Sequence, residues 1–276
     1  MFPTPPTPPT VSIVIPAYNE AASIRACVVA AIRQTVPASE IIVVDNRSTD
    51  ATTDIVRSIQ AEYPDSPLML FQQNEEQGLV PTRNFGFDRA QGSIIGRIDA
   101  DSVIEPNWVE EVQKAFADDS VAAASGPVLY YDMPMRRFGL KADDHMRRFI
   151  LKLWRDYRFL FGSNMAIRRS AWLAIRDQTC RDADDLFHED IDLSVHLAQN
   201  NLPVAYVPSM VSGMSARRLE DSPREYAFYV RRFERTYASH GLTNPMLRAP
   251  MVVFFAIYPL GKTIRSLRNR RLAHAA

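Results

Sequence analysis

The sequence predicts an α/β protein in which a doubly wound, mostly parallel sheet is flanked by helices. Two observations lead to this prediction. Apolar, β-branched runs typical of strands alternate with segments whose apolar residues recur at helical spacing. One run, EIIVVD at 40–45, is almost entirely apolar, as are strands buried on both faces of a parallel sheet. Such alternation builds a layered sheet with helices on both sides.

The first half of the chain supplies the regular part of this pattern. Strands are expected at 11–17, 40–45, 68–71 and 93–99, and helices at 20–34, 48–60, 80–90 and 106–117. Thr49 or Asp50 is expected to cap the second helix, because both side chains accept hydrogen bonds from exposed backbone N–H groups. Pro106 is expected to open the fourth helix, where proline is well tolerated.

The second half is less regular. It predicts a helix at 134–157, a strand and a short helix within 159–175, a helix at 188–200, a strand at 202–208 and a basic helix at 222–239. The tail that follows is apolar and then basic. We therefore expect a disordered Pro/Thr arm at 1–10, one domain at 11–240 and a helical, basic C-terminal extension at 241–276.

The net charge of zero conceals an uneven distribution. The 276 residues include 32 Lys/Arg and 32 Asp/Glu. Residues 1–216 hold 20 basic and 28 acidic side chains, and residues 217–276 hold 12 and 4, so the two parts carry −8 and +8. The composition excludes a disordered chain and a coiled-coil rod, and the neutral total argues against a nucleic-acid partner.

The expected location is the cytoplasm. The N-terminal MFPTPPTPPT lacks the features of a signal peptide, and the two cysteines, Cys27 and Cys180, give neither a metal-ligand spacing nor a disulfide framework. We expect Cys27 to be a small buried apolar residue.

The tail has two interpretations. Its apolar run at 249–261 contains two prolines and is 13 residues long, shorter than the roughly 20 residues that span a bilayer. An apolar segment followed by KTIRSLRNRR is typical of a helix that lies on an anionic membrane surface, here the inner face. The basic, aromatic stretch at 136–158 would add a second such face. The alternative is a helix that closes the core with its basic residues in solvent.

Polar side chains follow three of the predicted strands. They are PAYNE at 16–20, Asp45 with Asn46, and Asp99 with Asp101. Ligands of doubly wound sheets bind beyond the carboxyl ends of the strands, so we expect the three groups to gather at one edge. The alternative for each is a cap on the next helix.

Six segments, read together, resemble a known family. VSIVIPAYNE, VVDNRSTD, TRNFGFDRAQG, IDAD, GSNMAIRRSAW and HEDIDLSVHL have the order and spacing found in the family 2 inverting glycosyltransferases, from about Val11 to about Tyr237. The resemblance implies the GT-A fold and transfer of a sugar from a nucleotide-sugar donor to a hydroxyl acceptor. It implies a role in the biosynthesis of cell-envelope or surface polysaccharide, with a lipid-linked acceptor if the tail binds membrane. The oligomeric state is left open.

The Asp-x-Asp motif is the expected metal site. Departure of a diphosphate builds negative charge that a divalent cation neutralises, and carboxylates suit Mg²⁺ or Mn²⁺. By resemblance Asp101 contacts the metal, and Asp99 lies nearer the ribose or a metal-bound water. The alternative is that both are charges favoured at the N-terminus of the following helix.

The resemblance also assigns the residues that bind the nucleotide. It places Pro16, Tyr18 and Glu20 in the nucleotide-binding loop, with Tyr18 near the base and Glu20 near ribose hydroxyls. It places Asp45 at the base or ribose, and Asn46 where many members carry aspartate. Arg83 matches a position near the nucleotide pocket, and its alternative is an arginine exposed on a helix.

The pair Glu189–Asp190 is the expected catalytic centre. An inverting displacement needs a base on the acceptor hydroxyl, and the resemblance assigns that role to Asp190. Position in the first turn of a helix lowers the pKa of a carboxylate, whereas nearby carboxylates and phosphates raise it. The sequence leaves that balance open, and a mere cap is the alternative. Asn164 is expected on the sugar side, or else in a turn before the next helix.

Two other functions remain open from the sequence. A non-catalytic sugar-nucleotide-binding protein would have the same fold, although Asp99, Asp101 and Asp190 are all present. A nucleotidyltransferase would have a glycine-rich, basic loop after the first strand, which PAYNEAAS lacks. Some relatives carry a metal-ligating histidine after the strand at 202–208, whereas this chain reads PSMVSGMSARR.

Overall fold

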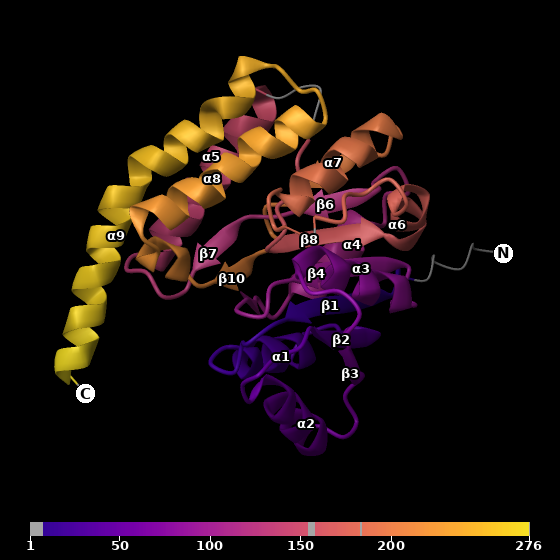
Figure 1. Cartoon of the computed structure of the whole chain (residues 1–276). Helices are drawn as coiled ribbons and strands as arrows, with labels where there is room; N and C mark the ends of the chain where they lie inside the picture. Colours follow the sequence, from indigo (N-terminus) through magenta and orange to yellow (C-terminus); the bar gives the residue numbers. More distant parts are fainter. Residues whose placement is uncertain (1–7, 154–157, 183, 276) are drawn as a thin grey trace.

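The computed structural model of the chain describes residues 8–153, 158–182 and 184–275 (Figure 1). Most of the Pro/Thr arm expected at 1–10 lies outside the described residues, as do residues 154–157 at the end of one expected helix.

A mixed, mostly parallel sheet forms the centre of the protein. In the described part of the chain it has seven strands in the order β3-β2-β1-β4-β8-β6-β9. Their bounds are β1 Val11–Ala17, β2 Glu40–Asp45, β3 Leu68–Gln72, β4 Ile94–Ile98, β6 Ala123–Ser125, β8 Asn164–Arg168 and β9 Val204–Tyr206. Strands β1 to β4 are parallel, as is the β6–β9 pair, whereas β8 runs antiparallel to both its neighbours. The predicted doubly wound sheet is confirmed.

A small second sheet was not anticipated. Its strands are β5 (Val103–Ile104), β10 (Ser212–Met214) and β7 (Val128–Tyr130), in that order across the sheet. Each is only two or three residues long. No side-chain periodicity develops over that length, so sequence pattern gives no signal.

Alternate residues of the central strands point into two separate cores. Ile13 and Ile15 of β1 pack in one core with α1 (Ile24–Ile32), α2 (Thr52–Glu62) and α4 (Trp108–Ala115). Val14 packs in the other core with α3 (Leu79–Arg89), α6 (Arg169–Ile175) and α7 (Glu189–Gln199). Cys27 is fully buried in the first core, as expected.

Helix α2 starts later than predicted. It begins at Thr52, and the Asp50 carboxylate accepts a hydrogen bond from the Thr52 N–H at 3.0 Å. The other Asp50 oxygen accepts from the Ala21 N–H at 3.0 Å, so this residue joins two loops instead of capping the helix.

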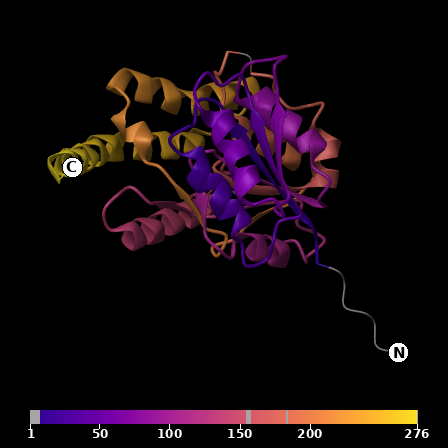
Figure 2. The same ribbon diagram turned by 90° about the horizontal axis from the view of Figure 1, so that it is seen from below.

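The helical part of the protein lies beside the sheet (Figures 1 and 2). It consists of α5 Arg136–Leu153, the 3₁₀ turn η1 Arg217–Glu220, α8 Pro223–Ser239, the 3₁₀ turn η2 Pro245–Arg248 and α9 Ala249–Ala275. Helix α8 opens with a capping box, in which Ser222 and Glu225 satisfy each other's backbone N–H groups.

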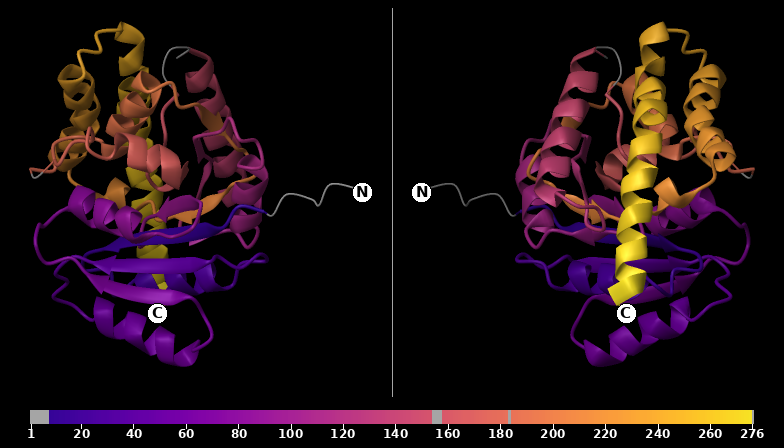
Figure 3. Two further views of the ribbon diagram at one scale, coloured as in Figure 1. Left: turned by 90° about the vertical axis from the view of Figure 1, so that its right-hand side faces the viewer. Right: turned by 90° about the vertical axis from the view of Figure 1, so that its left-hand side faces the viewer.

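The tail forms one long helix. Helix α9 continues through Pro259 and runs along one side of the protein (Figure 3). The apolar run at 249–261, expected to be too short to cross a bilayer, is therefore part of a longer helix. By length and composition, Pro245–Arg270 is apolar enough to cross a membrane, although soluble core helices pass the same test.

Asn164 ties the two sheets together at the start of β8. Its side chain is fully buried, and its Oδ1 accepts from the Trp108 Nε1–H at 2.8 Å. Its Nδ2 donates to the carbonyls of Pro127 and Met210, at 2.9 and 2.7 Å, just before β7 and β10. These bonds engage both ends of the amide, so we assign Asn164 to the scaffold instead of the expected sugar side.

The Asn164→Ala substitution tests this role. Because it leaves the buried Trp108 N–H and two carbonyls without partners, we expect it to lower the free energy of unfolding by about 2–4 kcal/mol. Urea unfolding measures the effect, with the exposed Asn74→Ala as a control that changes little. Unchanged stability with a raised donor KM would instead place Asn164 in the sugar site.

Candidate active site

The carboxyl ends of β1, β2 and β4 form one edge of the sheet, and the loops that follow β1 and β2 are joined there. The Asn19 N–H donates to Ser48 Oγ at 2.9 Å, and the Glu20 N–H donates to Thr52 Oγ1 at 2.8 Å. Asn19 itself adopts a left-handed backbone conformation, with φ of 54°. The predicted gathering of the three polar groups follows from the parallel pairing of the strands.

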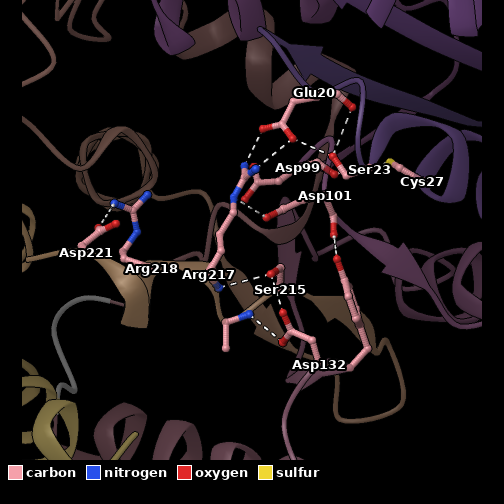
Figure 4. Close-up of polar contacts among 12 residues, drawn as sticks. Glu20, Ser23, Cys27, Asp99, Asp101, Asp132, Ser215, Arg217, Arg218 and Asp221 are labelled. Carbon is pink, nitrogen blue, oxygen red and sulfur yellow. Dashed lines mark hydrogen bonds and ion pairs between the residues drawn. The ribbon is translucent and has the colours of Figure 1, made fainter. Parts of the chain in front are cut away.

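Three carboxylates from this edge surround one arginine. Arg217, at the start of η1, points toward Glu20, Asp99 and Asp101 (Figure 4). Its Nε lies 3.1 Å from Asp101 Oδ2, and its terminal nitrogens donate to both oxygens of Glu20. Glu20 also accepts from Ser23 Oγ at 2.6 Å.

The acidic cluster carries more negative charge than Arg217 neutralises. Burial and the neighbouring Asp99 charge raise the pKa of Asp101 to about 6, against the opposing effect of Arg217. Carboxylate oxygens in such surroundings are suitable ligands for a hard divalent cation such as Mg²⁺ or Mn²⁺. The donor set of Asp99 and Asp101 therefore suits the metal that the sequence predicts.

Asp45 has an unsatisfied oxygen. The residue is 1% exposed, and its Oδ2 accepts from the Ser48 N–H at 3.2 Å. Its Oδ1 is buried with no hydrogen-bond partner among the described residues. Buried polar atoms are rarely left unpaired, so this oxygen is a candidate acceptor for a ligand.

The Asn46 side chain bonds a neighbouring loop. Its Nδ2 donates to the carbonyls of Gln73 and Glu76 at 2.8 and 2.9 Å, and its Oδ1 accepts from the Gly78 N–H. A carboxylate could not donate the first two bonds, so asparagine serves here to hold the 73–78 loop.

The other residues of the expected nucleotide loop differ in exposure. Tyr18 is 52% exposed, so its ring is open to a ligand. Pro16 is buried within β1, opposite Val44 of β2, and can only shape the start of the loop.

Arg97 connects the acidic cluster to the expected catalytic pair. It lies in β4 and is 2% exposed. One terminal nitrogen contacts Asp99 at 2.5 Å, and the other contacts Glu189 at 2.9 Å. Gly162 lies against this guanidinium, and a Cβ there would come within 2.1 Å of Arg97 Nη1.

Arg83 contacts the expected catalytic pair, Glu189 and Asp190, through the backbone of Glu189. It is fully buried in α3 and donates to the Glu189 carbonyl at 3.2 Å. The alternative of an exposed helix arginine is therefore wrong. The bonded partner is the backbone of α7, and Asn84 Oδ1 accepts its remaining bonds.

Glu189 and Asp190 have opposite pKa shifts. Burial raises the pKa of Glu189, but the Arg97 and Arg83 guanidinium groups outweigh burial and hold it below its ordinary value. Burial, and then the Glu189 charge, raise the pKa of Asp190 to about 7. The balance that the sequence left open thus favours a higher pKa, and a carboxylate with this value is an effective base near neutral pH.

The Asp190 carboxylate is held in place by backbone groups. Its Oδ2 accepts from the Gly162 N–H at 2.7 Å, and its Oδ1 accepts from the Ile191 N–H at 2.9 Å. The side chain is only partly buried, and His188 occupies the N-cap position of α7. Asp190 therefore accepts from one N–H of the first helical turn and also joins the helix to the loop at Gly162.

Sequence reasoning missed two central residues, Arg97 and Arg217. Arg97 had a usable signal, since a charge inside an apolar strand must find a buried partner. Arg217 had none, because its position depends on β10, which is too short to predict. The segment that offered no histidine, PSMVSGMSARR, supplies this arginine instead.

Solved structures define the class of fold. A mannosyltransferase from Pyrobaculum calidifontis, in complex with GDP-Man and Mn²⁺, aligns with a TM-score of 0.66 and 22% identity over 100% of this chain and 78% of that one. S. aureus TarS 1–349 in complex with UDP gives 0.52 and 12% identity over 83% and 72%. The fold is that of the GT-A glycosyltransferases.

Family models identify the family. Residues 12–174 match the model described as glycosyl transferase family 2, and residues 94–272 match glycosyl transferase family group 2. The chain belongs to glycosyl transferase family 2.

Curated relatives match this chain over part of their own length. Glycosyltransferase AglE from Haloferax volcanii is 35% identical over 124 residues, which are 44% of this chain and 40% of AglE. Chondroitin synthase from Pasteurella multocida is 35% identical over 115 residues, which are 42% of this chain and 12% of the synthase. The aligned segment thus spans less than half of each relative.

Proposed function

We propose that the protein transfers a sugar, with inversion, from a nucleotide-sugar donor to a hydroxyl acceptor in the synthesis of a surface or cell-envelope glycan. One observation carries this proposal. Arg97 contacts both Asp99 of the acidic cluster and Glu189 beside Asp190, which supports placing the proposed donor-binding end and the proposed base in one site. The family supports the reaction class.

The donor would lie along the edge of the sheet. The unpaired Asp45 Oδ1 would accept a hydrogen bond from the base or ribose, with Tyr18 near the base and Glu20 near the ribose. Arg217 would leave Asp101 and bind the diphosphate as a charged donor. Asp101 and Asp99 would hold a divalent cation, Mg²⁺ or Mn²⁺, which neutralises charge on the leaving diphosphate.

Asp190 would act as the base. As the acceptor oxygen bonds to the anomeric carbon, the bond from that carbon to the diphosphate oxygen breaks and the hydroxyl proton passes to an Asp190 oxygen. The Gly162 N–H fixes the orientation of this carboxylate, and Glu189 stays ionised beside it.

The Asp190→Asn substitution tests this role. We expect donor binding to stay within about twofold of wild type while turnover falls by at least about 100-fold, because the amide cannot take the proton. The readout is Mn²⁺-dependent release of nucleotide from UDP-, GDP- and dTDP-sugars, with water as the acceptor. Nucleotide binding is measured by calorimetry.

Asp177→Asn, which changes an exposed carboxylate, is the matched control and should behave as wild type. Wild-type turnover in Asp190→Asn would refute the assignment. If wild-type protein binds donors but releases nucleotide from none, the non-catalytic sugar-nucleotide-binding function is favoured instead.

We also propose that α9 lies on a membrane, on the inner face, where a lipid-linked acceptor would be reached. One face of α9 packs on the protein through Met251 and Tyr258. The other face exposes Val252 and Leu260, each 66% exposed, together with Phe255 and Ile257. Such an unpaired apolar face on a surface helix supports membrane contact.

The basic residues at the end of α9 are less available to bind lipid headgroups than the sequence predicts. Arg265 binds Asp132 and Glu220 at 2.7 Å each, and Lys262 and Arg268 donate to backbone carbonyls. These side chains fasten the tail to the domain. The attraction to lipid would therefore come mainly from the apolar face.

Flotation with liposomes tests this proposal. Because Val252 and Leu260 are exposed, replacing both with asparagine should spare folding and reduce the membrane-bound fraction several-fold. Leu173→Asn on α6, which is 41% exposed, is the control and should bind as wild type. Equal flotation of wild type and the double variant would refute a role for this face.

A further inference from the structure

A second cluster of metal-ligating side chains lies outside the acidic edge. Asp192 and His196 stand one turn apart on α7, and His240 follows the last turn of α8. One donor atom from each, a carboxylate oxygen or a ring nitrogen, lies within 4.8 Å of the others. Asp99 and Asp101 are not part of this group.

The distances suit a small tetrahedral ion. Asp192 Oδ1 lies 2.9 Å from His240 Nε2 and 3.5 Å from His196 Nε2. Ligand atoms around tetrahedral zinc, with bonds near 2.1 Å, stand roughly 3.4 Å apart. Two of the three separations thus lie near that value, and the third, between the two imidazole nitrogens, is at most 4.8 Å.

The surroundings are those of a metal site. Asp192 is 3% exposed, and both histidine side chains are 12% exposed. The other ring nitrogen of His196, Nδ1, lies 3.2 Å from Gln199 Oε1, the kind of contact that orients a ligating imidazole. The two rings stand edge to face, 5.1 Å apart.

Backbone contacts hold the carboxylate of the group. The Cys180 N–H donates to Asp192 Oδ2 at 2.9 Å, whereas the Cys180 sulfur is not among the donor atoms that lie within 4.8 Å of one another. Two imidazoles and one carboxylate make a donor set that favours zinc over Mg²⁺ or Mn²⁺.

We propose that Asp192, His196 and His240 form a Zn²⁺ site, with a water molecule as the fourth ligand. The ion would join α7 to the end of α8. Because Asp192 follows Asp190 on the same helix, the site would also fix the helix that carries the proposed base. It is a different site from the acidic edge, in ligands and in metal.

The test is the metal content of the chain, purified without an affinity tag. We expect about one zinc per chain by mass spectrometry, and tight binding of Co²⁺ with the intense visible bands of a tetrahedral site. Removing zinc with a chelator should lower Tm by several degrees, and zinc should restore it. Asp101→Asn should keep the zinc, whereas His196→Gln and His240→Gln should lose it.

His145→Gln is the matched control, because His145 is exposed on α5 and hydrogen-bonds the Lys141 carbonyl in its own helix. The proposal fails if wild-type protein holds no zinc and neither Zn²⁺ nor Co²⁺ changes its Tm or spectrum. It also fails if His145→Gln loses as much zinc as the other variants. The wild-type titration decides the matter even if a variant does not fold.

Discussion

The buried Arg97 guanidinium is the interaction on which the candidate site depends. It lies in the central strand β4, and its two arms reach Asp99 at the end of that strand and Glu189 at the start of α7. Removing one member of a buried ion pair costs about 3–5 kcal/mol, because the remaining charge is left without a partner. The two ends of the site are therefore fixed relative to each other by one side chain, and Gly162 is small enough to let it pass.

The same guanidinium contributes to the opposite pKa shifts of two adjacent carboxylates, Glu189 and Asp190. Glu189 receives the ion pair and keeps its charge, and that charge then raises the pKa of Asp190. A pair with opposite shifts is the usual arrangement where one carboxyl group must accept a proton and its neighbour must not. At the other end, Arg217 occupies the centre of three carboxylates, so binding of a cation there and movement of Arg217 are linked.

The sequence predicted the elements whose apolar residues are long runs or recur at regular spacing. It missed most of the strands that are too short to show such a pattern. Strands β1 and β2 have the expected bounds, because each is a continuous apolar run of the kind that is buried on both faces of a parallel sheet. Strands β5, β6, β7 and β10, each two or three residues long, carry too few residues for a pattern. Among the candidate site residues, Asp99, Asp101 and Glu20 lie together as expected.

Asn164 was misplaced because its neighbours Trp108, Pro127 and Met210 come from three distant segments. Local sequence cannot say whether a polar side chain at a strand start faces a ligand or the scaffold. The tail raised the same difficulty. The sequence predicted that its basic residues form an exposed charged surface, whereas Arg265 pairs with Asp132 and Glu220.

The claim that one site holds both the donor and the base is tested most directly by diffraction from crystals grown with Mn²⁺ and either UDP or GDP. Manganese scatters anomalously, so its position can be identified without ambiguity. We expect the peak beside Asp101, with Arg217 moved from Asp101 to the diphosphate and with Arg97 still bound to Asp99 and Glu189. A peak elsewhere, with the Arg217–Asp101 ion pair intact and no nucleotide at the sheet edge, would contradict this account.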